Sequence, residues 1–369
     1  MQLASTRRRL HILVALWWWD ERLLSGIVEF AHSHDWVLDA RIRFTHRRPT
    51  RRTYDGAIIF AGRHPSISLL RDTSIPIVNL AQHHNFKSAP KVYCDDREIG
   101  RVAGAHLFER GCKQIGFVSF SDSNSSAKKA RRAGLRAWCL AHHIPFSDFE
   151  FETLRTALPH IQKPLGLLVG NDELAVETIT ACQDYGFSVP DEIAILGVDD
   201  NDLFCRNASV PLSSVNLNLN RWGQEASTLL HGLIQGRRSL AGPVVIPPLG
   251  VSPRASTDIV NTANHYVAEA LRYLRQHFLS PVTIASLIRH VRISRQSMQN
   301  LFLRHVGHSM SEELMRLRIE HAKQLMLHSN LKLDAVAAAS GFTNRQHFHR
   351  TFQSKLGCPP GEWRKERIQ

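Results

Sequence analysis

Short apolar runs alternate with amphipathic stretches along roughly the first 250 residues of the chain. The expected buried strands are 10–16, 56–60, 75–80, 115–120, 166–169 and 193–198. The stretches between them repeat their apolar positions with a helical period, and the expected helices are 22–32, 100–110, 127–142, 173–185 and 220–234. Strand followed by helix, repeated in this way, predicts two parallel sheets with helices on both faces.

The pattern changes near residue 256. The segment 241–256 contains Pro243, Pro247, Pro248 and Pro253, so it cannot be helical and is expected to run as extended chain. After a polar link the remaining residues show helical periods almost without strand signals. We therefore expect an α/β domain over residues 1–256, a linker over 257–264 and an all-helical domain over 265–369.

The helical domain repeats one arrangement of helix, turn and helix. In the first copy, Ser294 is expected to cap a helix whose Phe302 faces inward. In the second copy, residues 340–342 form the turn, Thr343 is expected to cap the helix, and Phe352 faces inward. Both second helices carry a polar outer face, which is typical of a helix-turn-helix unit.

A long helix is expected to separate the two copies. Ser309 and Glu312 form a capping-box pattern, and the helix that they open should continue to about His328. Twenty residues would span roughly 30 Å, close to the ~34 Å of one DNA turn. The two polar helices could therefore enter successive major grooves.

Charge supports a polyanionic partner for the helical domain. The net charge is +13, and residues 262–369 contain 16 of the 46 Lys and Arg residues but only 7 of the 33 Asp and Glu residues. A local positive field favours nucleic acid, because neutralising phosphates releases counterions. A solvated basic face is the alternative.

Two segments near the C-terminus carry a family resemblance. Residues 341–352, GFTNRQHFHRTF, and residues 357–364, GCPPGEWR, closely resemble the AraC/XylS-type DNA-binding domain, and residues 318–327 resemble its linker helix. Arg292 stands in the first turn, where this family usually has glycine. The resemblance covers about 100 residues and implies double-stranded promoter DNA as the partner.

Side-chain chemistry selects candidate DNA contacts on the two outer faces. Arg can bond two acceptors of guanine, and Gln or Asn can bond adenine. The candidates for base contacts are Gln296, Gln299, Asn300, Arg345, Gln346 and His349, with Asn344 on the same outward side. Arg295, Arg304 and Arg350 are candidates for phosphate contacts. For each of these residues a solvated helix face is the alternative.

Polar residues follow the strands of the α/β domain. Asp20 comes directly after three tryptophans at 17–19, and the others that stand out are Asp95, Arg131, Asn171 and Asp199. Polar groups beyond the carboxyl ends of parallel strands converge on the crevice where open α/β sheets bind ligands. Carboxylates, amides and Arg suit sugar hydroxyls, and Trp can cover a C–H face. Alternatively, residues 199–202 form an ordinary capped turn and the tryptophans belong to the core.

This domain resembles the core of LacI/GalR-type regulators, which is similar to periplasmic sugar-binding proteins. The segments that fit are 75–78, 189–193 and 211–215. The resemblance implies Asp95, Arg131, Asn171 and Asp199 as effector contacts. The order of the two domains, and Asp20 six residues before Gly26, resemble the xylose-responsive AraC-type activators of bacteria. The three tryptophans and the arginine-rich stretch 41–52 depart from that subgroup.

The fold expected is therefore an α/β two-lobed periplasmic-binding-protein-like domain plus an all-α C-terminal domain with two helix-turn-helix units. We expect a cytoplasmic, bacterial, sugar-responsive transcription regulator, nucleoid-associated when bound to DNA. Its effector would be xylose or a related pentose, and its further partners a second copy of the chain and RNA polymerase. No catalysis, cofactor or metal is expected, and activation and repression both stay open.

The sequence also bears on two rival functions. An architectural DNA-binding protein would use the α/β domain only to dimerise. An enzyme is disfavoured because the sequence has no Gly-x-Ser-x-Gly, P-loop or Gly-x-Gly-x-x-Gly motif. The apolar run at 10–19 is too short to span a membrane, and it ends in charged residues rather than at a signal-peptide cleavage pattern. Six scattered cysteines indicate reduced thiols.

Overall fold

The computed structural model divides the chain into two compact units, residues 1–257 and 258–369. It describes residues 9–16, 18, 20–40, 54–60, 70, 73–82, 86, 89–121, 125–237, 242–259, 264–329 and 331–368. Trp17, Trp19 and the arginine-rich stretch 41–52 lie outside the described residues, as does part of the expected linker, 260–263.

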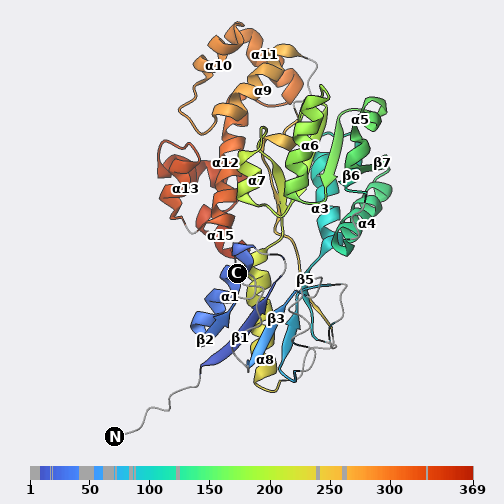
Figure 1. Cartoon of the computed structure of the whole chain (residues 1–369). Coiled ribbons are helices and arrows are strands. Elements are labelled where there is room, and N and C mark those ends of the chain that lie inside the picture. The colour runs from blue at the N-terminus through green and yellow to red at the C-terminus, as the bar shows by residue number, and fades with distance from the viewer. Residues whose placement is uncertain are drawn as a thin grey trace. The chain divides into compact units, whose positions relative to one another are not determined.

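The first lobe of the α/β unit is built on a parallel sheet. Its strands, in the order β2-β1-β3-β4, are β1 (Leu10–Ala15), β2 (Trp36–Asp39), β3 (Gly56–Ile59) and β4 (Ile77–Asn79). The central strands β1 and β3 are mostly apolar and almost wholly buried, as expected of strands covered on both faces. Helices α1 (Glu21–Ser33) and α8 (Leu219–Ile234) pack against each other on this lobe (Figure 1).

The second lobe has a larger sheet with the order β12-β10-β9-β8-β6-β7. Its strands are β6 (Gln114–Ser119), β7 (Phe146–Glu150), β8 (Leu165–Val169), β9 (Ile193–Val198), β10 (Ser213–Asn216) and β12 (Gly250–Ser252). Only β12 runs antiparallel to its neighbour among the described strands of this sheet. The helices of this lobe are α3 (Asp96–Glu109), α4 (Ser126–Ala141), α5 (Leu154–Ala157), α6 (Asp172–Asp184) and α7 (Asp202–Asn207).

The described chain passes between the lobes at three places. It crosses after β5 (Val92–Cys94), after β10 and after β11 (Val244–Ile246), and β5 and β11 pair in parallel beside the first lobe. The parallel α/β fold is thus confirmed. The edge strands β2, β7 and β12, the inner strand β10 and the paired strands β5 and β11 were not predicted. β7, for example, has only one buried side chain and no apolar run. Helix α3 also begins at Asp96 rather than near Gly100.

The second unit is all helical, as predicted. It contains α9 (His265–His277), α10 (Ile284–Val291), α11 (Arg295–Val306), α12 (Met310–His328), α13 (Leu333–Ala339), α14 (Arg345–Leu356) and α15 (Pro360–Ile368). Helix α12 opens with the predicted capping box and ends at the predicted residue. It contributes to two separate apolar cores, one around Met298 and Phe302 and the other around Phe348 and Phe352.

A buried arginine joins the two helix-turn-helix cores. Arg318 of α12 donates from Nε to the backbone oxygen of Phe278 at 2.8 Å and from Nη2 to that of Ser280 at 3.1 Å. Gly341, at φ 78°, lies so close that a Cβ would stand 2.7 Å from the same Phe278 oxygen. The end of α9, the middle of α12 and the turn before α14 therefore meet at one point. None of the described helices is both long and apolar enough to span a bilayer.

Candidate functional site

Predicted effector residues from different elements gather around Asp199. This residue follows β9, Asp20 caps the N-terminus of α1, and Arg131 lies on α4. The charges that act on the Asp199 carboxyl are those of Arg131, Asp172, Arg22 and Asp20. Asp95, the N-cap of α3, lies in the same region. Burial raises the pKa of the Cys94 thiol, and the charges of Asp95, Arg131 and Asp199 are among those that also influence it. The structure therefore brings these predicted side chains close enough to one another to interact electrostatically.

Arg131 is held in place by a buried ion pair. Its Nε donates to Oδ1 of Asp96 at 2.8 Å, and its Nη1 donates to the backbone oxygen of Gly170 at 2.9 Å. Helices α3 and α4 approach closely here, because a Cβ on Gly100 would stand 2.1 Å from the backbone oxygen of Arg131. Sequence reasoning missed the role of Asp96. Its only signal was its position beside Asp95 at the start of a helix.

The loop after β9 has an unusual backbone. Asp199 and Asp200 are consecutive non-glycine residues with positive φ, at 117° and 52°. Such conformations cost of order 1–3 kcal/mol each and persist only where the surroundings hold them. The amide of Asp200 donates to Oγ of Ser214 at 2.9 Å, which fixes the loop to β10.

Buried polar side chains around this loop hold it in place through a network of hydrogen bonds. The Asp200 carboxylate accepts from Asn216 at 2.9 Å, from Ser252 at 2.6 Å and from Arg254 at 2.8 Å. These partners, Arg254 above all, hold the pKa of Asp200 below its usual range despite its burial. Asp172, the first residue of α6, accepts from Ser214 Oγ at 2.6 Å and from the amide of Asn201 at 2.8 Å. Burial raises the pKa of Asp172 to about 6.

Two polar groups next to this network stand out. Burial raises the pKa of the Asp199 carboxyl to about 8 although Arg131 opposes the shift. Oδ1 of Asn171 is buried without a partner at the start of α6. Unsatisfied buried polar groups are rare in proteins and need an explanation. A bound polyol could donate to Oδ1 of Asn171 and also hydrogen-bond to the Asp199 carboxyl.

An arginine that sequence reasoning did not select connects α1 of the first lobe with the loop after β9 of the second lobe. Arg22, on the first turn of α1, donates from Nε and Nη2 to the two carboxylate oxygens of Asp20 at 3.0 and 2.9 Å. The same guanidinium donates to the backbone oxygens of Asp199 and Asp200, each at 2.7 Å. Its only sequence signal was a charge two residues after Asp20.

Part of the tryptophan cluster lies beside this region. The Trp18 ring stands 6.4 Å from that of Trp222, whose Nε1 donates to the backbone oxygen of Val92 at 2.8 Å. Trp18 is partly exposed, so an apolar ring face borders the first lobe near the crossing strand β5. No cluster of three metal-ligating side chains occurs among the residues that the structure describes.

The first helix-turn-helix unit presents the predicted residues to solvent. Ser294 caps α11, as predicted, and accepts from the amide of Ser297 at 3.1 Å. All five predicted DNA contacts of this unit are exposed, namely Arg295, Gln296, Gln299, Asn300 and Arg304. Arg292 ends α10 at φ 55°, in the left-handed region that glycine adopts most readily. The turn therefore keeps its geometry without the glycine.

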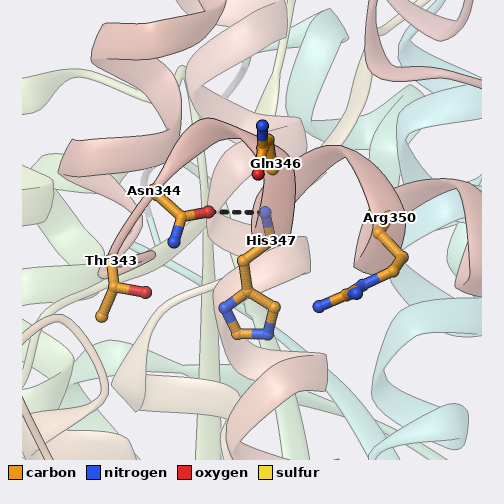
Figure 2. Close-up of a pocket in the computed structure, with 5 residues that line it drawn as sticks. All are labelled: Thr343, Asn344, Gln346, His347 and Arg350. Atoms are coloured by element: carbon orange, nitrogen blue, oxygen red, sulfur yellow. Dashed lines mark hydrogen bonds between the residues drawn. The ribbon is translucent and has the colours of Figure 1, made fainter.

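In the second unit, the start of α14 borders a surface hollow of about 440 Å³. It is lined by Thr343, Asn344, Gln346, His347 and Arg350 (Figure 2). The predicted cap was wrong by one residue, because Asn344 rather than Thr343 is the N-cap. Its Oδ1 accepts from the amide of His347 at 2.8 Å, as Figure 2 shows. Sequence reasoning did not select His347, which also lines this hollow. Its position in the first turn of the helix could have indicated it.

The other predicted contacts of the second unit differ in their solvent exposure. Arg345 is exposed, and its Nε lies 3.2 Å from the exposed carboxylate of Asp334. Gln346 and Arg350 are exposed as well. His349 is only partly exposed, and its Nε2 is buried without a hydrogen-bond partner. The prediction that His349 faces outward was therefore only half correct, because this edge of its ring turns toward the core.

Comparisons with known proteins match both units. A family model described as a periplasmic binding protein-like domain matches residues 105–257, and a helix-turn-helix domain model matches residues 287–366. The xylose operon regulatory protein of Haemophilus influenzae is 22% identical over 367 residues, which cover 94% of this chain and 95% of that protein.

Solved structures show the same fold. A structure described as the xylose-binding transcription activator xylR matches 98% of this chain and 99% of its own, with a TM-score of 0.64 and 20% identity. A periplasmic binding protein/LacI transcriptional regulator from Alkaliphilus metalliredigens, complexed with D-xylulofuranose, matches 67% of this chain and 98% of its own. Its TM-score is 0.53 and its identity 19%.

Fold, site and matches together define a class of protein. The chain is a DNA-binding transcriptional regulator, not an enzyme, and it joins a periplasmic-binding-protein-like domain to an AraC-type helix-turn-helix region. Within that class it is a distant, full-length homologue of the xylose operon regulatory proteins.

Proposed function

We propose that a pentose, D-xylose or a close relative, binds in the mouth between the lobes and controls how the helical unit binds promoter DNA. The observation that carries the proposal is the unsatisfied Oδ1 of Asn171, together with the buried Asp199 carboxyl and the fixed guanidinium of Arg131. A sugar offers hydroxyls that both donate and accept, so it can satisfy all three. The names of the relatives, which mention xylose and D-xylulofuranose, favour a pentose.

The assignment of parts follows from this proposal. Residues 1–256 bind the effector and dimerise, residues 257–264 link, and residues 265–369 bind DNA in a cytoplasmic regulator that acts with RNA polymerase. Asp20, Asp95, Arg131, Asn171 and Asp199 contact the effector. Binding favours the closed lobes and so shifts the population of dimers whose helical units reach adjacent half-sites.

Calorimetry of the full chain tests the effector. D-xylose is titrated with D-ribose, L-arabinose and D-glucose as comparisons, and Asp199→Ala and Asn171→Ala are expected to lose the D-xylose heat. Arg132→Ala is the matched control, because Arg132 lies beside Arg131 but pairs with Asp148 on the surface. Flat titrations with every sugar would instead favour an architectural DNA-binding protein whose α/β unit only dimerises.

Quantitative footprinting on the promoter tests the DNA contacts. Arg345→Ala should weaken the cognate site by about 1–3 kcal/mol and relax sequence choice, because arginine can read guanine at two acceptors. Arg304→Ala should weaken all sequences alike and lower the salt dependence, as expected for a phosphate contact. Equal losses on cognate and random DNA for both variants would contradict these roles.

A further inference from the structure

Arg22 connects residues of both lobes without any ligand. Helix α1, which carries Arg22, packs on the first lobe, whereas Asp199 and Asp200 follow β9 of the second lobe. The side chain binds the Asp20 carboxylate on its own lobe and two successive backbone oxygens on the other lobe. Four of the five N–H groups of the guanidinium are engaged in this way.

The unusual backbone of the loop explains why one side chain can make both contacts. Positive φ at Asp199 and Asp200 turns two consecutive carbonyl groups toward the same guanidinium. Hydrogen bonds from a charged donor are stronger than neutral ones, and a planar fork fixes the direction of both acceptors. The Asp20 carboxylate in turn fixes the guanidinium, so the three groups hold one another.

We infer that Arg22 is a positioning residue of the effector site, which sets the Asp20 carboxylate of one lobe and the Asp199 loop of the other in the arrangement that binds the ligand. The inference rests on the proposed function, since Asp20 and Asp199 are its proposed contacts. Arg22 supplies part of the lobe closure that the ligand would otherwise have to provide. A protein already biased toward the binding-competent state binds with higher apparent affinity.

A role for Arg22 as a competitor of the ligand predicts a change in Kd of the opposite sign. If Arg22 merely filled the place of the ligand, its removal would free the site and tighten binding. The two roles are therefore separated by the direction of the change in Kd, not only by its size.

Hydrogen exchange of the ligand-free full chain tests the contact itself. In Arg22→Met we expect exchange to accelerate in both residues 20–24 and residues 199–203, because each side loses its partner. The amide of Arg22 still donates to Asp20 in this variant, so the cap of α1 survives. Arg206→Met is the matched control, since Arg206 lies on α7 just after the same loop but pairs with the exposed Asp202 of its own helix. Acceleration in only one of the two segments would overturn the inference.

Calorimetry with D-xylose then tests positioning. We expect Kd to rise at least tenfold in Arg22→Met, to rise less in Arg22→Lys, which keeps the charge but not the fork, and to stay unchanged in Arg206→Met. An unchanged or lower Kd in Arg22→Met would overturn the inference. If the natural chain gives no heat with any sugar, the proposed function fails, and the exchange result alone decides whether Arg22 joins the two segments.

Discussion

Substitution of Asp199 by Asn should raise the stability of the α/β unit near neutral pH and at the same time weaken its binding of the effector. Burial raises the pKa of Asp199 from its ordinary value of 3.8 to about 8. Between these two values the folded chain keeps a proton that the unfolded chain has released. Stability therefore falls as pH rises across this window. Asp199→Asn removes the titration while keeping nearly the same shape, so the variant should become more stable than the natural chain as pH rises.

The size of the effect follows from the shift. Each pH unit between the two pKa values costs about 1.4 kcal/mol. From pH 6 to pH 7.5 the variant should gain about 2 kcal/mol relative to the natural chain, and the difference should level off above about pH 8. Asp172, whose pKa is about 6, and the histidines are present in both proteins, so most of their contribution cancels in the difference.

Urea unfolding at several pH values measures this difference. Tryptophan fluorescence suits the measurement because six of the seven tryptophans lie in residues 1–257, so the signal reports mainly on the α/β unit. D-xylose calorimetry on the same samples should show weaker binding by the more stable variant. A stability difference that stays flat between pH 6 and pH 8 would refute the assignment of a buried, protonated Asp199.

Two further predictions concern turns of the helical unit, and hydrogen exchange of its amides measures both. Gly341→Ala should destabilise more than Gly357→Ala. Both glycines have nearly the same positive φ, but only at Gly341 would the new methyl stand 2.7 Å from the Phe278 oxygen. Equal losses of stability in the two variants would show that this close approach has no cost. Arg292→Gly should slow exchange in α10 and α11 by relieving left-handed strain of about 1 kcal/mol, whereas Arg292→Ala should bring no gain.

The sequence was sufficient to predict the elements whose signals are local. The strands β1, β3, β8 and β9 are apolar runs buried on both faces, and such runs stand out in any window. The capping box of α12 and the glycine turn before α14 are short-range patterns with defined geometry. The edge strands β2, β7 and β12 were missed because only part of each is buried, and β7 forms mainly through its pairing with β6. The inner strand β10 is buried but is mostly polar in sequence, so it shows no apolar run.

The candidate site was only partly predictable, for a physical reason. The polar residues at strand ends could be found because the carboxyl ends of parallel strands share one edge. The partners that orient these residues could not be found from the sequence, because Arg131 and Asp96 are 35 positions apart and Arg22 and Asp199 are 177 positions apart. For His349, helical periodicity predicted an outward ring, but packing beside Phe348 turned one edge inward.

Several departures from local structural rules occur together in the loop after β9 of the α/β unit. Asp199 and Asp200 adopt positive φ, Asp199 has a raised pKa, and Arg22 binds their backbone oxygens from the other lobe. The positive φ angles and the buried carboxyl would each destabilise the fold on their own, and the hydrogen bonds around Asp200 and from Arg22 hold the loop. A ligand that satisfies Asp199 would act on the strained loop, the titrating carboxyl and the contact between the lobes at once. This loop is therefore where a small effector can change the equilibrium of the whole α/β unit with few contacts.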